Sequence, residues 1–302
     1  MTHSQLDHIS DLLKNSPLDL GGDVEKMRRV FDEMLGSAPL PDDVRTRTTE
    51  LGEVPAVEVR AGSPATTAGT VLYFHGGAYA IGSAAASVGL VSEIARRTAT
   101  TAYSVDYRLA PEHPFPAAVD DALAAYRALL DRGVPAGSVA VTGESAGGGL
   151  ALALLLAIRD AGLPQPSSAT VLSPWADLTQ SGGTMTSRAD TDPALTRGAL
   201  EIRAADYLDG ADPRTPLASP LHADLRGLPP LLIQAGGREI LLDDALRLAA
   251  RAAHADVPVT LRTFPGAPHV FQGFAAVVEE AALALDQVAA FINNLLHPEG
   301  RR

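Results

Sequence analysis

A serine near the middle of the chain lies in a setting that is typical of an activated nucleophile. The segment Gly143–Gly147 reads Gly-Glu-Ser-Ala-Gly and fits the pattern G-x-S-x-G around Ser145. In this pattern the serine occupies a strained turn between a strand and a helix, so both flanking positions must be small. The helix that follows directs free N–H groups at an oxyanion beside the serine. A chance match is the alternative, but the strand–turn–helix setting favours acyl transfer with Ser145 as nucleophile.

Acyl transfer also needs N–H donors that are directed at the oxygen of the tetrahedral intermediate. Gly76 and Gly77 come shortly after the apolar run Thr70–Phe74, in the loop that such folds use for this purpose. Glycine lets the backbone approach a substrate closely. We therefore predict an oxyanion hole made by the N–H groups of Gly76, Gly77 and Ala146. Two glycines after a strand more often mark a simple turn, but the downstream serine pattern favours the functional interpretation.

A histidine late in the chain is the candidate general base. His269 follows the predicted strand 257–264, and α/β folds place catalytic groups in loops at the carboxyl ends of strands. His254 lies inside a predicted helix and His297 lies close to the last residue, so neither occupies such a loop. A neutral imidazole at position 269 could accept the hydroxyl proton of Ser145.

The acid that orients this histidine is expected between the serine and the histidine in the chain. The predicted strand 231–234 is followed by Glu239, Asp243 and Asp244. Asp243 falls in the first turn of a predicted helix, where a carboxylate suits the helix dipole for structural reasons alone. On the residues by themselves, Glu239 and Asp243 both remain candidates.

The elements that must position these residues alternate between strand and helix. Strands are predicted over residues 54–59, 70–74, 101–105, 138–142, 169–172, 231–234 and 257–264. Helices are predicted over residues 116–130, 146–160, 241–255 and 275–296. Such alternation predicts an α/β fold with a mostly parallel sheet and helices on both faces. Two amphipathic helices are predicted within residues 6–35, and residues 177–212 read as an insertion over the sheet.

Composition bounds the class of protein. The 302 residues contain 46% hydrophobic and 20% charged residues, which suits one globular α/β domain over 1–302. The net charge of −12, with no basic stripe, argues against a nucleic-acid partner. There is no cysteine, so disulfides and thiolate metal sites are excluded, and the histidines form no cluster that suggests a metal. The polar start and the short apolar runs indicate neither a secretory signal nor a membrane span. A cytoplasmic location is expected.

Three motifs in a fixed order resemble those of a known family. They are the segment His75–Gly77 (His-Gly-Gly), the segment Asp106–Glu112 (Asp-Tyr-Arg-Leu-Ala-Pro-Glu) and the serine segment Gly143–Gly147, with Phe115–Ala118 as further support. Together they resemble the hormone-sensitive-lipase-like carboxylesterases, bacterial family IV of the α/β-hydrolase superfamily, over about residues 50 to 295. The resemblance implies an α/β-hydrolase fold with a helical cap, here about 1–45 and about 177–212. It also implies hydrolysis of short- to medium-chain acyl esters, without a cofactor, in a pocket between core and cap.

Two departures from the family pattern concern the active site. Ala78 stands where the family often has a third glycine. The family's acid is usually an aspartate followed four residues later by a second aspartate, and this pattern places Glu239 on the catalytic position. The thirty residues from Glu239 to His269 agree with the family's usual spacing. The resemblance therefore favours a Ser-Glu-His triad over one that contains Asp243.

Other assignments are weaker. Tyr79, Trp175, Tyr207 and Phe271 are candidates to line the substrate pocket, although aromatic residues more often belong to the core. Glu144 could equally orient polar groups behind the serine or be a paired buried carboxylate. A lactonase or an amidase could use the same triad. A non-catalytic small-molecule receptor on a hydrolase fold is the alternative of another class, but such receptors lack the histidine. The resemblance also suggests a homodimer that pairs through the strand at residues 257–264.

Overall fold

One central sheet forms the middle of the fold, and the helices pack against it. The computed structural model describes residues 5–36, 40–62 and 69–296, and in this part of the chain eight strands form one sheet in the order β1-β2-β4-β3-β5-β6-β7-β8. The strands are β1 (Val44–Leu51), β2 (Val54–Ala61), β3 (Thr70–Phe74), β4 (Thr101–Val105), β5 (Val139–Glu144), β6 (Ser168–Leu172), β7 (Leu231–Gly236) and β8 (Val259–Phe264). The pairs from β4 to β8 are parallel, whereas β1 and β2 are antiparallel to their neighbours. The predicted α/β-hydrolase fold with a mostly parallel sheet is confirmed.

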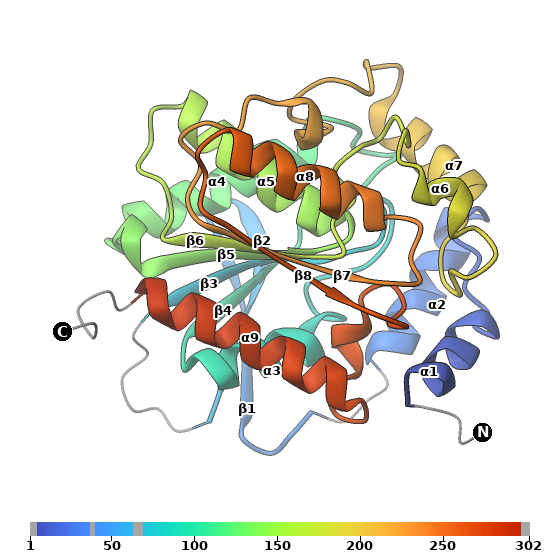
Figure 1. Cartoon of the computed structure of the whole chain (residues 1–302). Helices are drawn as coiled ribbons and strands as arrows, with labels where there is room; N and C mark the ends of the chain where they lie inside the picture. Colours follow the sequence, from blue (N-terminus) through green and yellow to red (C-terminus); the bar gives the residue numbers. More distant parts are fainter. Residues whose placement is uncertain (1–4, 37–39, 63–68, 297–302) are drawn as a thin grey trace.

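Helices cover both faces of this sheet, as predicted. They are α1 (Gln5–Lys14), α2 (Val24–Gly36), α3 (Val88–Thr98), α4 (Ala117–Asp131), α5 (Ala146–Asp160), α6 (Thr184–Ser187), α7 (Arg197–Leu208), α8 (Leu242–His254) and α9 (Glu279–Leu296). Helices α4, α5 and α8 pack on one face, and α3 and α9 pack on the other (Figure 1). Short 3-10 turns occur at 136–138, 220–222 and 271–274. No helix within the described ranges combines the length and the apolar character that crossing a membrane requires.

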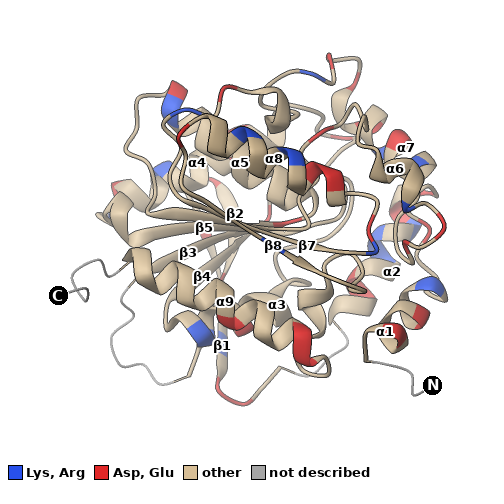
Figure 2. Ribbon diagram, viewed as in Figure 1, with Lys and Arg blue, Asp and Glu red and all other residues tan. Residues whose placement is uncertain are grey.

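The core lies on both sides of the central strands. In β3, Leu72 and Phe74 join the cluster under α4 and α5, while Val71 and Tyr73 join the cluster under α3 and α9. This alternation follows from the opposite directions of successive side chains in a strand. Charged residues are concentrated on the helices and loops (Figure 2), and Glu144 at the end of β5 is an exception in the central strands. A carboxylate at that place therefore calls for a specific partner.

Helices α1, α2, α6 and α7 gather at one side of the molecule, at the right in Figure 1. The turn before α2 packs against α7, because a Cβ atom added at Gly21 would lie 3.6 Å from Ala199. The two segments predicted as a cap thus lie against each other. Residues 1–4 and 37–39 of the first segment, and His297, lie outside the described residues.

Some elements differ from the prediction. Strand β1 and helix α3 were not predicted, β8 begins two residues later than expected, and α9 begins at Glu279 after a 3-10 turn. In β1 the sequence Val-Arg-Thr-Arg-Thr-Thr-Glu-Leu has only two buried residues, Val44 and Leu51. An edge strand with so few apolar residues cannot be predicted from the alternation of apolar and polar residues. His254 lies at the end of α8, as predicted.

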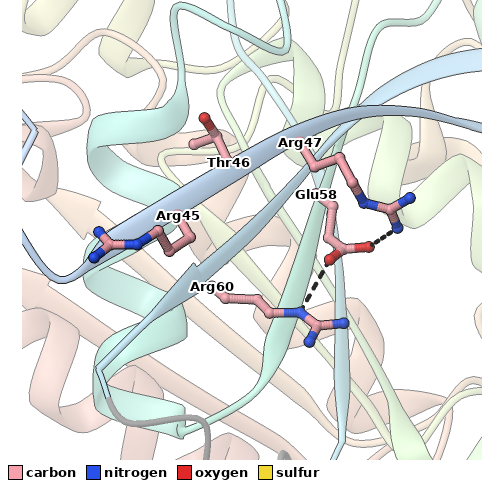
Figure 3. A pocket seen from close by; sticks show the side chains of 5 residues that line it. All are labelled: Arg45, Thr46, Arg47, Glu58 and Arg60. Atoms are coloured by element: carbon pink, nitrogen blue, oxygen red, sulfur yellow. Dashed lines mark hydrogen bonds and ion pairs between the residues drawn. The ribbon is translucent and has the colours of Figure 1, made fainter.

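The first hairpin carries a group of arginines at one edge of the sheet. Arg45 and Arg60 are directly opposite each other, and Arg47 is opposite Glu58. Arg47 and Arg60 both point at the Glu58 carboxylate, at 2.6 Å and 3.0 Å (Figure 3). Charged side chains on an edge strand oppose pairing with a second chain. The other edge is β8, for which dimer formation stays a prediction.

Candidate active site

The nucleophile candidate occupies a strained turn. Ser145 lies between β5 and α5 with φ of +52° and ψ of −122°. A Cβ atom added at Gly143 would lie 2.1 Å from the Gly147 carbonyl oxygen, and one added at Gly147 would lie 2.1 Å from that of Phe74. The prediction that both flanking positions must be small is confirmed. The Ser145 side chain is partly exposed, and within the described residues its hydroxyl makes no hydrogen bond.

The loop after β3 lies directly against this turn, but the N–H group of one of its two glycines is already hydrogen-bonded. A Cβ atom added at Gly76 would lie 3.2 Å from the Ser145 Cβ. The Gly76 N–H donates to Glu144 Oε1 at 3.3 Å, so Gly76 is not a free oxyanion donor. This contact also gives Glu144 its partner. In the described part of the chain, the N–H groups of Gly77, Ala78 and Ala146 have no hydrogen-bond acceptor.

The imidazole of His75 fixes the start of this loop. His75 is completely buried, and its Nδ1 lies 2.7 Å from the Gly76 carbonyl oxygen. Its ring stacks on Tyr107 with a centroid distance of 4.3 Å, and the Tyr107 hydroxyl donates to the His75 carbonyl oxygen at 2.8 Å. Burial lowers the pKa of His75, which favours the neutral ring. These contacts position the loop backbone rather than reacting groups.

The acid and the base candidates meet at the carboxyl ends of β7 and β8. His269 Nδ1 donates to Glu239 Oε2 at 2.5 Å, and Glu239 is completely buried. The other carboxylate oxygen of Glu239 accepts from the Gly236 N–H at 2.5 Å. Asp243 lies in the first turn of α8, where it accepts the Gly183 N–H at 2.5 Å. The structure therefore brings Glu239, and not Asp243, to His269.

Ser173, which the sequence analysis missed, joins the parts of the site. Its hydroxyl donates to Glu239 Oε1 at 2.9 Å and accepts the Val270 N–H at 3.2 Å. The preceding residue, Leu172, accepts the Ser145 N–H at 2.9 Å. The end of β6 thus contacts all three candidate segments. Its position after a strand end is the signal that could have revealed Ser173, because α/β folds place site residues there.

Carboxylates surround the imidazole of His269. Burial acts to lower the pKa of His269, but the hydrogen bond and the charge of Glu239 outweigh it. The charges of Asp192 and Glu144 act in the same direction, so the pKa is raised above its ordinary value. Burial raises the pKa of Glu144, although the Gly76 N–H opposes that change. A raised pKa suits a base that must hold a proton during a reaction step.

Three of the four predicted pocket aromatics come together. Tyr79 stacks on Tyr207 with a centroid distance of 3.8 Å and lies 6.1 Å from the ring of Trp175. All three are almost completely buried. Phe271 differs, because it packs in a separate cluster with residues of α1 and α9 and with Phe264. We correct that assignment: Phe271 is a core residue that supports the loop after β8.

Comparison with known proteins places the chain among esterases. The sequence profile of a family described as having the alpha/beta hydrolase fold matches residues 71–273. An acetyl-hydrolase of Streptomyces hygroscopicus is 42% identical over 297 residues, covering 97% of each chain. An esterase of Acinetobacter venetianus is 37% identical over 270 residues, covering 89% of this chain and 88% of the relative.

Solved structures agree with these relatives. The crystal structure of an esterase from the bacterial hormone-sensitive lipase family has a TM-score of 0.94 and 41% identity, covering 98% of this chain and all of that one. EstE5, in a crystal soaked with p-nitrophenyl butyrate, has a TM-score of 0.91 and 39% identity, covering 97% of this chain and 98% of that chain. The chain therefore belongs to the hormone-sensitive-lipase-like family of α/β-hydrolase esterases and is a carboxylic ester hydrolase.

Proposed function

We propose that this chain hydrolyses short- to medium-chain acyl esters with Ser145 as nucleophile, His269 as base and Glu239 as triad acid. The observation that carries the proposal is the 2.5 Å hydrogen bond from His269 Nδ1 to the buried Glu239 carboxylate, beside the strained turn of Ser145. This bond leaves His269 Nε2 unprotonated and able to accept a proton. A non-catalytic receptor would have no use for such a pair.

The reaction proceeds in two halves. Ser145 Oγ attacks the ester carbonyl carbon while its proton passes to His269 Nε2, and the C–O bond to the alcohol breaks as His269 returns that proton to the leaving oxygen. Water then attacks the acyl-enzyme, His269 takes its proton, and the carboxylic acid leaves as Ser145 is reprotonated. The hydrogen bond from Ser145 to the imidazole forms in the substrate complex, where catalytic contacts commonly tighten.

The oxyanion of each tetrahedral intermediate is bound by backbone amides. We assign this role to the N–H groups of Gly77, Ala78 and Ala146, and no longer to Gly76, whose N–H already binds Glu144. The absence of a third glycine does not disable the loop, since Ala78 itself adopts a positive φ of 52°. Each such donor contributes roughly a hundredfold or more in rate.

A cap formed by about 1–45 and about 177–212 covers the site in this proposal. The aromatic group of Tyr79, Trp175 and Tyr207 lies next to the oxyanion loop and supports a small acyl pocket. The whole chain then acts as one domain. Lactones and amides have the same kind of reacting carbonyl, so they are tested together with esters.

The test uses purified protein and p-nitrophenyl acetate. Ser145→Ala is expected to abolish turnover and to keep the wild-type Tm, because the partly exposed hydroxyl makes no hydrogen bond within the described residues. A sulfonyl fluoride should add one equivalent to the wild type and none to the variant, measured by intact mass. His269→Asn is also expected to abolish turnover, and His254→Asn is its control, because His254 lies at the exposed end of α8. Labelling at another residue, or an active Ser145→Ala, would contradict the proposal.

A further inference from the structure

The segment after β6 contacts the turn that carries the triad acid through several side chains. Asp192 Oδ2 accepts the Ile240 N–H at 2.8 Å, and Thr184 Oγ1 donates to the Ile240 carbonyl oxygen at 2.7 Å. Both backbone polar groups of the residue after Glu239 are thus bound by one segment, residues 177–212.

The two side chains are themselves fixed. Asp192 Oδ1 accepts the N–H groups of Ala194 and Leu195, both at 2.9 Å, so its carboxylate cannot rotate freely. Thr184 is buried, and its hydroxyl also accepts the Asp243 N–H at 2.9 Å. Together these contacts clamp the backbone of Ile240 to the segment 177–212.

We propose that Asp192 and Thr184 are positioning residues that couple the segment 177–212 to Glu239 and, through Glu239, to His269. The inference rests on the proposed function, because it takes Glu239 and His269 as triad members. It goes further in giving the segment a second task besides covering the substrate. The contacts therefore connect the segment that covers the substrate in the proposed function with the turn that carries the acid.

Asp192 also acts on the imidazole by its charge. Three carboxylates influence His269: Glu239 from the turn after β7, Glu144 from the end of β5 and Asp192 from the segment after β6. Each favours the protonated ring. Neutralising Asp192 should therefore lower the pKa of His269, whereas removal of the Thr184 contact alone leaves this charge in place.

The experiment compares Asp192→Asn with Asp190→Asn, a matched control at an exposed position two residues away. We expect the acid limb of the kcat/KM profile of Asp192→Asn to move to lower pH by about 0.5 unit, which is less than the one unit or more that a charge in direct contact causes. Its plateau should fall about tenfold, since small misplacements of catalytic groups are costly. Asp190→Asn should match the wild type. An acid limb within 0.2 unit of the wild type would overturn the electrostatic part.

A second measurement does not depend on turnover. In a Ser145→Ala background, an NMR titration of the His269 imidazole, assigned with His269→Asn, should show the same downward shift when Asp192→Asn is added. With Ser145 present, Thr184→Val should lower kcat, whereas Thr184→Ser, which keeps the hydroxyl, should have the wild-type kcat. In the Ser145→Ala background, Thr184→Val should change the titration of His269 little. If Thr184→Val keeps wild-type kcat, the clamp has no positioning role. An active Ser145→Ala would instead contradict the proposed function. The titration of His269 would then be the only test of the effect of Asp192.

Discussion

Glu239, the proposed triad acid, offers the sharpest test of the site, because a neutral amide of the same shape cannot accept all three of its hydrogen bonds. Glu239 accepts three hydrogen bonds, from His269 Nδ1, the Ser173 hydroxyl and the Gly236 N–H. In Glu239→Gln one oxygen can still accept from Ser173 and Gly236. The amide NH₂ then faces Nδ1, which must lose its proton, and the proton moves to Nε2. That tautomer cannot accept the proton of Ser145.

The size of the effect follows from this tautomer. Loss of a triad carboxylate with retained geometry costs about a thousandfold to ten-thousandfold in kcat, or about 4 to 5.5 kcal/mol of transition-state stabilisation. The free energy of unfolding should change by only about 1 kcal/mol, since glutamine fills the same volume and keeps two of the three contacts. The assay is kcat for p-nitrophenyl acetate together with Tm.

Asp243→Asn is the matched comparison. Its carboxylate binds the Gly183 N–H in the first turn of α8, and asparagine retains an acceptor there. Only the interaction of a charge with the helix dipole is lost, which costs about 0.3 to 1 kcal/mol. We expect a slightly lower Tm and a kcat within a few-fold of the wild type. An inactive Asp243→Asn beside an active Glu239→Gln would show that the triad acid is Asp243 and that the observed contact misleads.

Two further predictions follow from the same site. Because carboxylates raise the pKa of His269, the wild-type kcat/KM should fall as the pH drops through a value above the ordinary imidazole value of about 6.5, and a profile flat from pH 5 to 8 would speak against a histidine base. In a series of p-nitrophenyl esters, turnover should be best at acyl chains of about two to eight carbons and fall steeply beyond, because a pocket covered by the proposed cap is small; faster hydrolysis of long-chain triglycerides would refute the small pocket.

Much of the fold follows from sequence because its central strands are short apolar runs. Residues such as those of β3 are buried on both faces, so no other element satisfies their composition and length. Strand β1 escaped because its arginines and threonines face solvent at an edge. Helix α3 escaped although Val88, Val91, Ile94 and Ala95 have helical spacing and are buried. The side chain of Ser87, the residue before that helix, accepts no capping N–H.

The sequence allowed us to predict candidate site residues that belong to a motif. It did not reveal those that are recognised only by a contact in the folded chain. Ser145, His269 and Glu239 follow strand ends that share one edge of the sheet, as the pattern predicts, and their catalytic roles stay a proposal. Asp192 could not be found, because its importance comes from a contact with Ile240 made across 48 positions of the chain. Gly76 was misassigned because two glycines look alike in a sequence, and only the contact with Glu144 separates them.

The turn that carries Glu239 is held in place by close packing of its backbone. Gly236, the last residue of β7, and Gly237 precede this acid. They allow close packing, because a Cβ atom added at Gly236 would lie 2.4 Å from the Ala267 carbonyl oxygen. The Gly237 N–H donates to Phe264 at 2.8 Å and the Arg238 N–H to Ala267 at 3.0 Å, so the loops after β7 and β8 are joined backbone to backbone. The separation of these two loops sets the distance between acid and base. A longer carboxylate side chain is then compatible with a rigid triad, provided that neither glycine is replaced.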